Sequence, residues 1–163
     1  MRDEDFQAFY QEHARRLWAY IARISSDPSV ADDVVQESFL RLWELDRFDA
    51  MTPEHRKNYL YKIAANLVKR GARKPSEQAL ADLPGPESAE QIHEWIGIRN
   101  ALDRMKTAER NLLWLAYVEG FSHREIGAIA GYAENSVRPL LHRAKQRLLR
   151  FLSADGRSGR EEQ

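Results

Sequence analysis

Apolar side chains recur at steps of three and four residues in three stretches of the first 70 residues. This spacing gathers the apolar positions on one face of an α-helix. The stretches predict helices over 6–24, 28–45 and 53–70. Pro28 and Pro53 stand at the start of two of them, where proline suits a helix best. The first part of the chain is therefore expected to be a small helical bundle.

A break in this pattern divides the chain into two halves. Residues 71–91 hold three of the six prolines and show no apolar stripe beyond Leu80 and Leu83. This composition is typical of a flexible linker, and about 20 residues can extend over roughly 60 Å. The two halves can therefore occupy separated targets.

The second half returns to the helical spacing over residues 92–152. Its first part predicts helices over 92–105 and 107–117, and no segment of the chain shows the alternation of a β-strand. We therefore expect an all-α protein of two small helical bundles joined by a flexible linker. The domains are residues 1–70 and 92–152, and residues 153–163 are expected to form a flexible tail.

Residues 119–152 contain a short helix, a glycine turn and a second helix. Ser122 and Glu125 have the spacing of a capping box at the first helix, and Gly131 can supply the left-handed residue that ends it. The second helix has arginine, lysine and histidine on its polar side. Such a pair is typical of a helix-turn-helix whose second helix lies in the DNA major groove. An amphipathic helix pair with a solvated basic face is the alternative.

The formal net charge is zero, from 25 basic and 25 acidic residues, but the charge is unevenly distributed. Residues 92–152 carry 10 basic and 6 acidic residues, whereas residues 1–70 carry 11 and 12. The positive excess therefore coincides with the helix-turn-helix. So small an excess holds DNA only weakly through its phosphates, which indicates that a partner brings the protein to DNA.

The chain lacks the residue patterns of common catalytic and metal sites. It has no cysteine, and its five histidines are scattered without metal-ligand spacing. No glycine-rich phosphate loop follows a strand, and no nucleophile elbow is present. We therefore expect no enzymatic activity, no metal and no cofactor. The missing cysteines, long apolar runs and signal-peptide pattern predict a cytoplasmic protein without a membrane span.

Three stretches carry a resemblance to a known family. Residues 31–44 read ADDVVQESFLRLWE, residues 58–70 read NYLYKIAANLVKR, and residues 102–148 include the helix-turn-helix. In this order they resemble regions 2.2, 2.3–2.4 and 4 of the bacterial sigma-70 family, in its extracytoplasmic-function (ECF) group. The resemblance implies a factor that binds core RNA polymerase, directs it to promoters and helps to melt the −10 region.

The resemblance also implies which helices contact the polymerase. In the family, the region 2.2 helix docks on the clamp helices of the β′ subunit, and the first helices of region 4 hold the β-flap. The β′ contact would fall to a mixed acidic and apolar set: Asp32, Asp33, Gln36, Glu37, Phe39, Leu40 and Trp43.

The −10 element would be read by the loop at about 45–56 and the helix that follows it. In the family this part takes a flipped base of the non-template strand, and bases stack on aromatic rings while cations follow the backbone. For Tyr59 and Tyr61, ordinary core or rim positions are the alternative. The candidate residues are Arg56, Tyr59, Tyr61, Lys62, Asn66 and Lys69.

The −35 duplex would be read by the second helix of the helix-turn-helix. The sequence departs from the family pattern at Pro139 and Leu140, where a small polar residue and an arginine are usual. Pro139 fits if the helix begins near Asn135 or Ser136, and otherwise kinks it. Leu140 either contacts a thymine methyl group or leaves region 4 dependent on polymerase or another protein. The candidate residues are Asn135, Ser136, Arg138, His142, Arg143 and Lys145.

Two other functions fit parts of the sequence. A sigma-like decoy would bind an anti-sigma factor or polymerase without reading a −35 element, and a free-standing repressor would need to dimerise. The resemblance implies instead a factor that is monomeric when free. Its partners would be core RNA polymerase, promoter DNA and an anti-sigma factor, with no membrane contact.

Overall fold

The computed structural model describes residues 2–25, 27–71 and 97–161, and every regular element within these ranges is helical. The all-α prediction is confirmed. Most of the predicted linker, and residues 92–96 of the predicted helix 92–105, lie outside the described residues. The elements are α1 (Arg2–Ser25), α2 (Pro28–Trp43), a 3-10 turn (Phe48–Ala50), α3 (Pro53–Arg70), a helical segment at 97–103, α5 (Thr107–Leu113), a π-helical turn (Trp114–Val118), α6 (His123–Ala130) and α7 (Glu134–Glu161).

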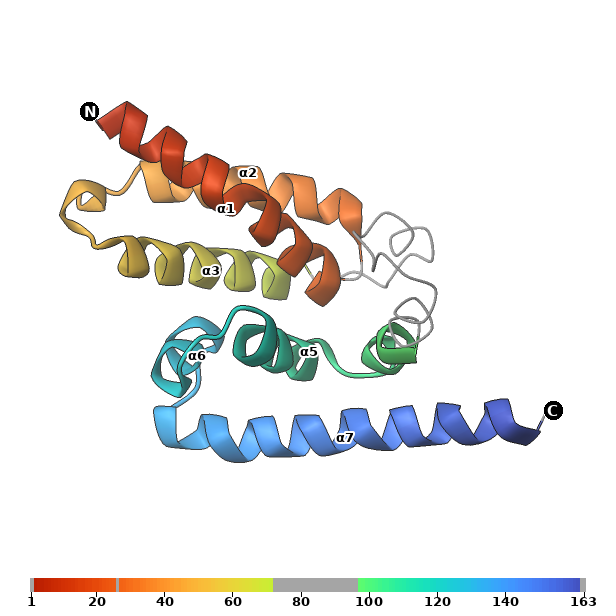
Figure 1. Ribbon diagram of the computed structural model, residues 1–163. Coiled ribbons are helices and arrows are strands. Elements are labelled where there is room, and N and C mark those ends of the chain that lie inside the picture. Colours follow the sequence, from red (N-terminus) through yellow and green to blue (C-terminus); the bar gives the residue numbers. More distant parts are fainter. Residues whose placement is uncertain (1, 26, 72–96, 162–163) are drawn as a thin grey trace.

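Helices α1, α2 and α3 form the N-terminal half, in which each helix packs against the other two (Figure 1). Both α2 and α3 begin with proline behind a polar cap. The Asp27 side chain accepts from the Ser29 amide at 3.0 Å, and the Thr52 hydroxyl accepts from the His55 amide at 3.3 Å. The apolar stripes of the three helices meet in a core that includes Leu17, Ile21, Val34, Leu42, Phe48 and Leu60.

Helices α6 and α7 form the helix-turn-helix in the C-terminal half. Ser122 and Glu125 make the predicted capping box, and Gly131 ends α6 with a φ of 83°. The two helices approach closely at Gly127, where an added Cβ would lie 2.7 Å from the Tyr132 carbonyl oxygen. The turn therefore requires glycine at position 131 for its positive φ, and at position 127 because a Cβ would overlap the backbone.

Two helix ends differ from the sequence prediction. Helix α5 ends at Leu113 and continues as the π-helical turn, so the last turn of the predicted helix 107–117 has a wider hydrogen-bonding pattern. Helix α7 runs to Glu161, so residues 153–161 extend the helix where we expected a flexible tail. Each glycine in this stretch costs about 1 kcal/mol of helix propensity relative to alanine, which weakens a helix without ending it.

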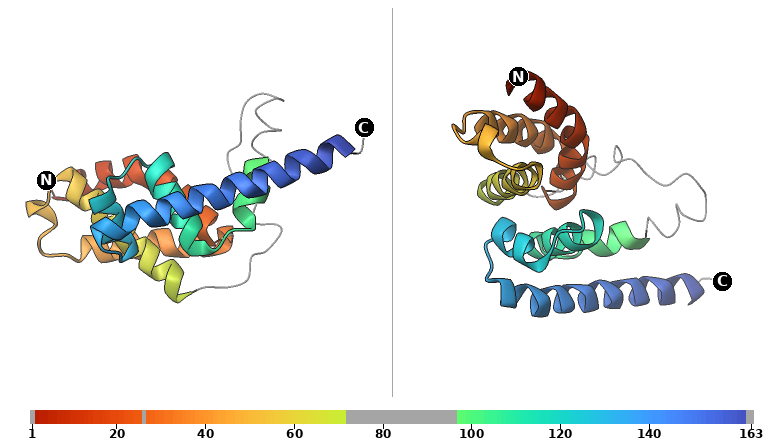
Figure 2. Two further views of the ribbon diagram at one scale, coloured as in Figure 1. Left: turned by 90° about the horizontal axis from the view of Figure 1, so that it is seen from below. Right: turned by 60° about the vertical axis from the view of Figure 1, so that its left-hand side comes forward.

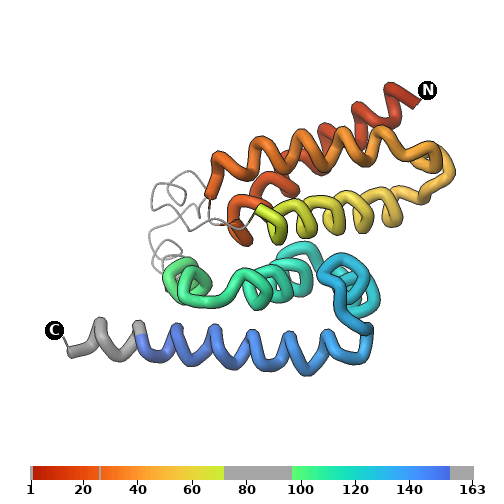
Figure 3. Tube along the Cα trace, turned by 180° about the vertical axis from the view of Figure 1, so that it is seen from behind, coloured from red at the N-terminus to blue at the C-terminus, as the bar shows by residue number. Residues whose placement is uncertain are grey.

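The two halves pack directly against each other, which the sequence did not indicate. Helix α3 lies against α6 and α1 lies against α5, and the two halves form adjacent layers (Figure 2, right, and Figure 3). Tyr20, Tyr61 and Phe121 meet at this boundary. The ring centroids are 5.0 Å apart for Tyr20 and Tyr61 and 5.3 Å apart for Tyr61 and Phe121. One hydrophobic core therefore crosses from one half to the other.

A smaller apolar cluster fixes the long helix α7 to the rest of the C-terminal half. Alongside it, Arg147 Nη1 lies 3.2 Å from Glu109 Oε1. The cluster consists of Met105, Leu113 and Ala144, with Leu102, Leu148 and Phe151 packed around them.

No helix within the described ranges is both long and apolar enough to cross a membrane.

Replacing Gly127 with alanine should destabilise the protein, because the new methyl group would overlap the Tyr132 carbonyl and push α6 away from the turn. We expect a loss of about 1–3 kcal/mol in the free energy of unfolding, measured by urea denaturation. Gly97→Ala is the matched control, since a Cβ there meets nothing within 4 Å. Equal stability of the two variants would contradict the close approach of α6 to the turn.

Candidate nucleic-acid and protein interfaces

The outer surface of α2 carries most of the predicted protein-binding residues. Asp32, Asp33, Gln36 and Leu40 are exposed, Glu37 and Trp43 are half-buried, and Phe39 is buried. Two of the acidic side chains have partners within the N-terminal half. Asp32 accepts a hydrogen bond from Trp18 Nε1 at 2.8 Å, and Glu37 pairs with Arg41 at 2.6 Å. The surface therefore combines fixed carboxylates with an exposed apolar side chain.

An apolar groove runs between the start of α1 and the end of α2. Its sides are aromatic: the Phe6 and Trp43 ring centroids are 4.7 Å apart, and those of Tyr10 and Phe39 are also 4.7 Å apart. Leu40, at the edge of the groove, is 52% exposed and extends this apolar surface towards solvent. The sequence identified Phe39, Leu40 and Trp43 but not Phe6 and Tyr10, whose helical spacing also fits an ordinary core stripe.

Helix α3 presents a polar line to solvent. Lys62, Asn66 and Lys69 are all exposed and follow one another at helical spacing. Tyr59 is half-buried, with the Arg47 guanidinium 5.3 Å from its ring centroid. Arg47, which the sequence prediction did not include, therefore joins the candidate nucleic-acid surface.

Arg56 makes contacts within the N-terminal half, and its predicted contact with nucleic acid stays a prediction. Its Nε donates to the Phe48 carbonyl at 3.0 Å, and its guanidinium carbon lies 4.1 Å from the centroid of the Phe48 ring. Arg56 therefore fixes the loop between α2 and α3. Its guanidinium would contact nucleic acid from this position beside Phe48.

Tyr61 is inaccessible in this conformation. Its side chain is 0% exposed, because it packs between Tyr20 and Phe121 at the boundary between the halves. Burial, followed by the neighbouring Glu119 carboxylate, raises the pKa of its hydroxyl above the ordinary value. A Tyr61 contact with DNA stays a prediction, and it requires the two halves to separate.

The predicted major-groove residues of α7 lie on its open side. Asn135, Arg138, His142, Arg143 and Lys145 are exposed, and Ser136 is half-buried. The helix begins at Glu134 and continues through Pro139 without interruption (Figure 1), so proline removes one hydrogen-bond donor without ending the helix.

Leu140 contributes to packing within the C-terminal half. It is half-buried and lies against the shared core. Leucine at this position, where the family usually has arginine, therefore packs against the core near the start of α7. Contact with a thymine methyl group stays one of the two predictions for Leu140.

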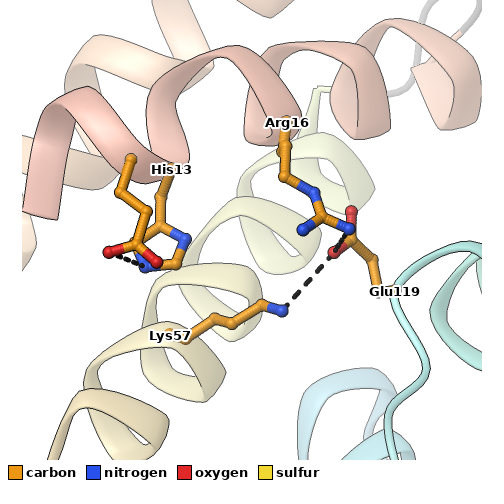
Figure 4. Close-up of polar contacts among 5 residues, drawn as sticks. His13, Arg16, Lys57 and Glu119 are labelled. Carbon is orange, nitrogen blue, oxygen red and sulfur yellow. Dashed lines mark ion pairs between the residues drawn. The ribbon is translucent and has the colours of Figure 1, made fainter.

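Glu119 forms the main polar contact between the halves (Figure 4). Its Oε2 lies 3.5 Å from Arg16 Nη2 on α1 and 3.6 Å from Lys57 Nζ on α3. The Glu119 side chain is only 1% exposed. The Lys57 Nζ also lies 4.9 Å from the centroid of the Phe121 ring. We call the contacts of Glu119 with Arg16 and with Lys57 the inter-half ion pairs; no sequence motif had indicated them.

Further polar groups are buried along the contact between α1 and the C-terminal half. Arg110 Nη2 donates to the Ile24 carbonyl at 3.2 Å, and the Tyr20 hydroxyl donates to Asn111 Oδ1. Burial raises the pKa of Asp103, while the nearby Arg23 guanidinium opposes that change. The boundary therefore contains specific polar partners as well as apolar side chains.

His13 lies beside the inter-half ion pairs (Figure 4). It is buried, and its Nε2 is 3.7 Å from Glu12 Oε2. Burial lowers the pKa of His13 below its ordinary value, which Glu12 opposes and Lys57 and Arg16 reinforce. The fold therefore favours the neutral imidazole.

The described residues enclose a cavity between the halves and hold no cluster of metal-ligating side chains. A cavity of about 260 Å³ lies between the halves, with Asn66 and Lys69 on one side and Ile129 and Tyr132 on the other. In the part of the chain that the structure describes, no three His, Asp or Glu side chains are grouped to hold a metal ion.

Comparisons with known proteins identify both halves. Residues 9–77 match the family model Sigma-70 region 2, and residues 96–148 match Sigma-70, region 4. The ECF RNA polymerase sigma factor SigL of Mycobacterium tuberculosis is 30% identical over 151 residues, which cover 87% of this chain and 85% of SigL.

Two solved structures share the fold. The sigma factor RpoE of Bartonella quintana, in complex with the anti-sigma factor NepR, has a TM-score of 0.71 with 24% sequence identity, over 93% of this chain and 99% of RpoE. CnrH in complex with the cytosolic domain of CnrY has a TM-score of 0.69, also with 24% identity, over 94% of this chain and 90% of CnrH.

The burial of His13 predicts how stability depends on pH. Because the folded protein lowers the pKa of His13, the stability from its neutral form is fully present above its ordinary value of about 6.5 and is lost as the pH falls through the folded value. The free energy of unfolding should therefore decrease more steeply between about pH 7 and pH 5 in the wild type than in His13→Gln. His142→Gln removes an exposed histidine and should follow the wild type. Parallel curves for all three proteins would contradict the prediction.

Proposed function

The chain belongs to the ECF sigma factors of the sigma-70 family, and we propose that it divides promoter recognition between α3 and α7. Like the other members, it binds core RNA polymerase and promoter DNA. Sigma factors act on polymerase and DNA in the cell interior, and we propose a cytoplasmic protein with no catalytic activity of its own.

The surface of α2 and the apolar groove beside it are the proposed contact with the β′ clamp helices. The observation that supports this assignment is the exposed Leu40 between fixed carboxylates and an aromatic groove. An exposed apolar patch rimmed by polar groups is typical of a protein-binding surface. Phe6 and Tyr10 extend the proposed contact from α2 onto α1.

Helix α3 and the loop before it are the proposed contact with the −10 element. Lys62, Asn66 and Lys69 form an exposed line suited to a nucleic-acid backbone. Tyr59 and Arg47 lie together at the loop and offer an aromatic face beside a cation. An unstacked base suits this arrangement, because stacking and cation contacts act on any base.

Helix α7 is the proposed contact with the −35 element. Its unbroken course through Pro139 and the exposure of Asn135 and Arg138 near its start support major-groove recognition. These features favour a factor that reads promoters over a decoy. Since the solved relatives are complexes with NepR and CnrY, we also propose that an anti-sigma factor binds this chain.

Run-off transcription with core RNA polymerase on genomic fragments tests the proposed function. Adding the factor should create specific start sites. Leu40→Asp should reduce core binding and transcription by about tenfold or more, because it places a charge in the apolar groove. The matched control is Leu149→Asp, which changes a leucine of the same 52% exposure on α7 and should leave core binding unchanged. An absence of specific starts with the unmodified factor would rule the function out.

The role of α7 can be tested on the promoters found in this way. Arg138→Ala should lower transcription from promoters that depend on a −35 element by about tenfold, because one good base contact contributes about 1–3 kcal/mol of discrimination. Arg150→Ala removes the same charge at an exposed position three turns further along α7 and should have a much smaller effect. Equal effects of the two substitutions would indicate a purely electrostatic contribution.

A further inference from the structure

Glu134 places a negative charge at the start of a helix that is otherwise basic. It is the first residue of α7, and the sequence has no other aspartate or glutamate between it and residue 152. Its side chain is exposed. A helix dipole favours an acid in the first turn, but a carboxylate on a DNA-binding helix also repels phosphates. The position of this charge therefore needs a second explanation.

Glu134 lies at an open pocket where the helix-turn-helix begins both of its helices. The pocket is lined by His123 of α6 and by Glu134, Asn135 and Arg138 of α7. All four side chains are exposed, whereas Val137, which points to another side of α7, is buried. Helix α6 and the start of α7 lie at the same end of the C-terminal half (Figure 1). A carboxylate, an amide and a guanidinium are therefore presented on one surface.

Basic residues further along α7 have partners within the protein. Lys145 Nζ lies 5.9 Å from the centroid of the Tyr117 ring, and Arg147 pairs with Glu109 at 3.2 Å. The recognition helix of a helix-turn-helix contacts bases mainly with its N-terminal residues. The first two turns of α7, which include Glu134, are therefore the part best placed to read bases.

The major groove offers a carboxylate few hydrogen-bond donors. Guanine and thymine present acceptors there, which repel a negative charge. Adenine presents its N6 amino group beside the N7 acceptor, so attraction and repulsion act together. Cytosine presents its N4 amino group without an acceptor of its own. A carboxylate therefore selects cytosine, and much of its selectivity comes from repulsion by the other bases.

The spacing of Glu134 and Arg138 relates this cytosine to a second base. The two residues are four positions apart, so their side chains are neighbours on one face of the helix. Four residues rise about 6 Å, which is less than two base-pair steps of about 3.4 Å. Arg138 suits guanine, because a guanidinium can contact O6 and N7 together. The two bases should therefore lie within about two base pairs of each other.

We propose that Glu134 is a base-reading residue: its carboxylate accepts a hydrogen bond from the N4 amino group of one cytosine in the −35 element and rejects guanine and thymine at that position. This inference rests on the proposed role of α7 in promoter recognition. It adds a residue that the sequence prediction did not include. Glu134 lowers the general affinity of α7 for DNA and raises its selectivity.

Single-round transcription by the holoenzyme tests this proposal on a promoter found by run-off transcription. Each base pair of the −35 region is replaced in turn by the other three. The unmodified factor should prefer cytosine over guanine and thymine at one position by about tenfold. Glu134→Gln should move that preference to adenine, because an amide can contact N6 and N7 together. Glu134→Ala should remove the preference by raising transcription from the guanine and thymine templates.

Two other variants make the result specific. Glu4→Ala is the matched control, because it removes an exposed carboxylate from the first turn of α1. It should leave the cytosine preference unchanged. Asn135→Ala should alter the preference at a different base pair. If Glu134→Ala fails to fold, the shift to adenine in Glu134→Gln, which keeps the size of the side chain, still decides the proposal.

Each outcome supports or overturns the base contact. A cytosine preference that persists in both Glu134 variants would overturn it, and so would an equal fall in transcription from all templates, which a merely structural role predicts. A change confined to the guanine position of Arg138 would make Glu134 a positioning residue and would also overturn it. Specific starts without any cytosine preference would refute this inference alone, whereas an absence of specific starts would refute the proposed function.

Discussion

The burial of Tyr61 between Tyr20 and Phe121 is the interaction on which the rest of the structure depends. These rings come from α1, α3 and the segment before α6, and their centroids lie 5.0 and 5.3 Å apart. Aromatic side chains bury about 150–250 Å² each, so this contact gives the boundary its apolar driving force. It also brings Glu119 to Arg16 and Lys57. The ion pairs of Glu119 then fix how the two halves are aligned, which apolar packing of the rings alone would not determine.

This packing determines which candidate binding surfaces are exposed to solvent and which are covered. The groove beside Leu40, the line from Lys62 to Lys69 and the exposed side of α7 face solvent. Tyr61 and most of Lys57 are covered. The proposed polymerase contact on α2 is therefore open to solvent in this conformation, whereas Tyr61 on α3 is not.

Features set by neighbouring residues could be predicted from the sequence, and those set by distant contacts could not. The helical spacing, the Ser122–Glu125 capping box and the turn at Gly131 depend on a few adjacent residues, and all three were correct. Tyr61 was assigned to DNA from its place in a motif, but Tyr20 and Phe121, both far along the chain, bury it fully. Glu119 carried no local signal, because its role depends on two helices more than 60 residues away.

The shared core of the two halves is the central claim, and nuclear magnetic resonance of the free full-length chain tests it most directly. With ring centroids 5.3 Å apart, the aromatic protons of Tyr61 and Phe121 should show a nuclear Overhauser effect, and Tyr61→Leu should abolish it. The absence of this effect in a folded sample, with the cross-peaks within each half intact, would contradict the account.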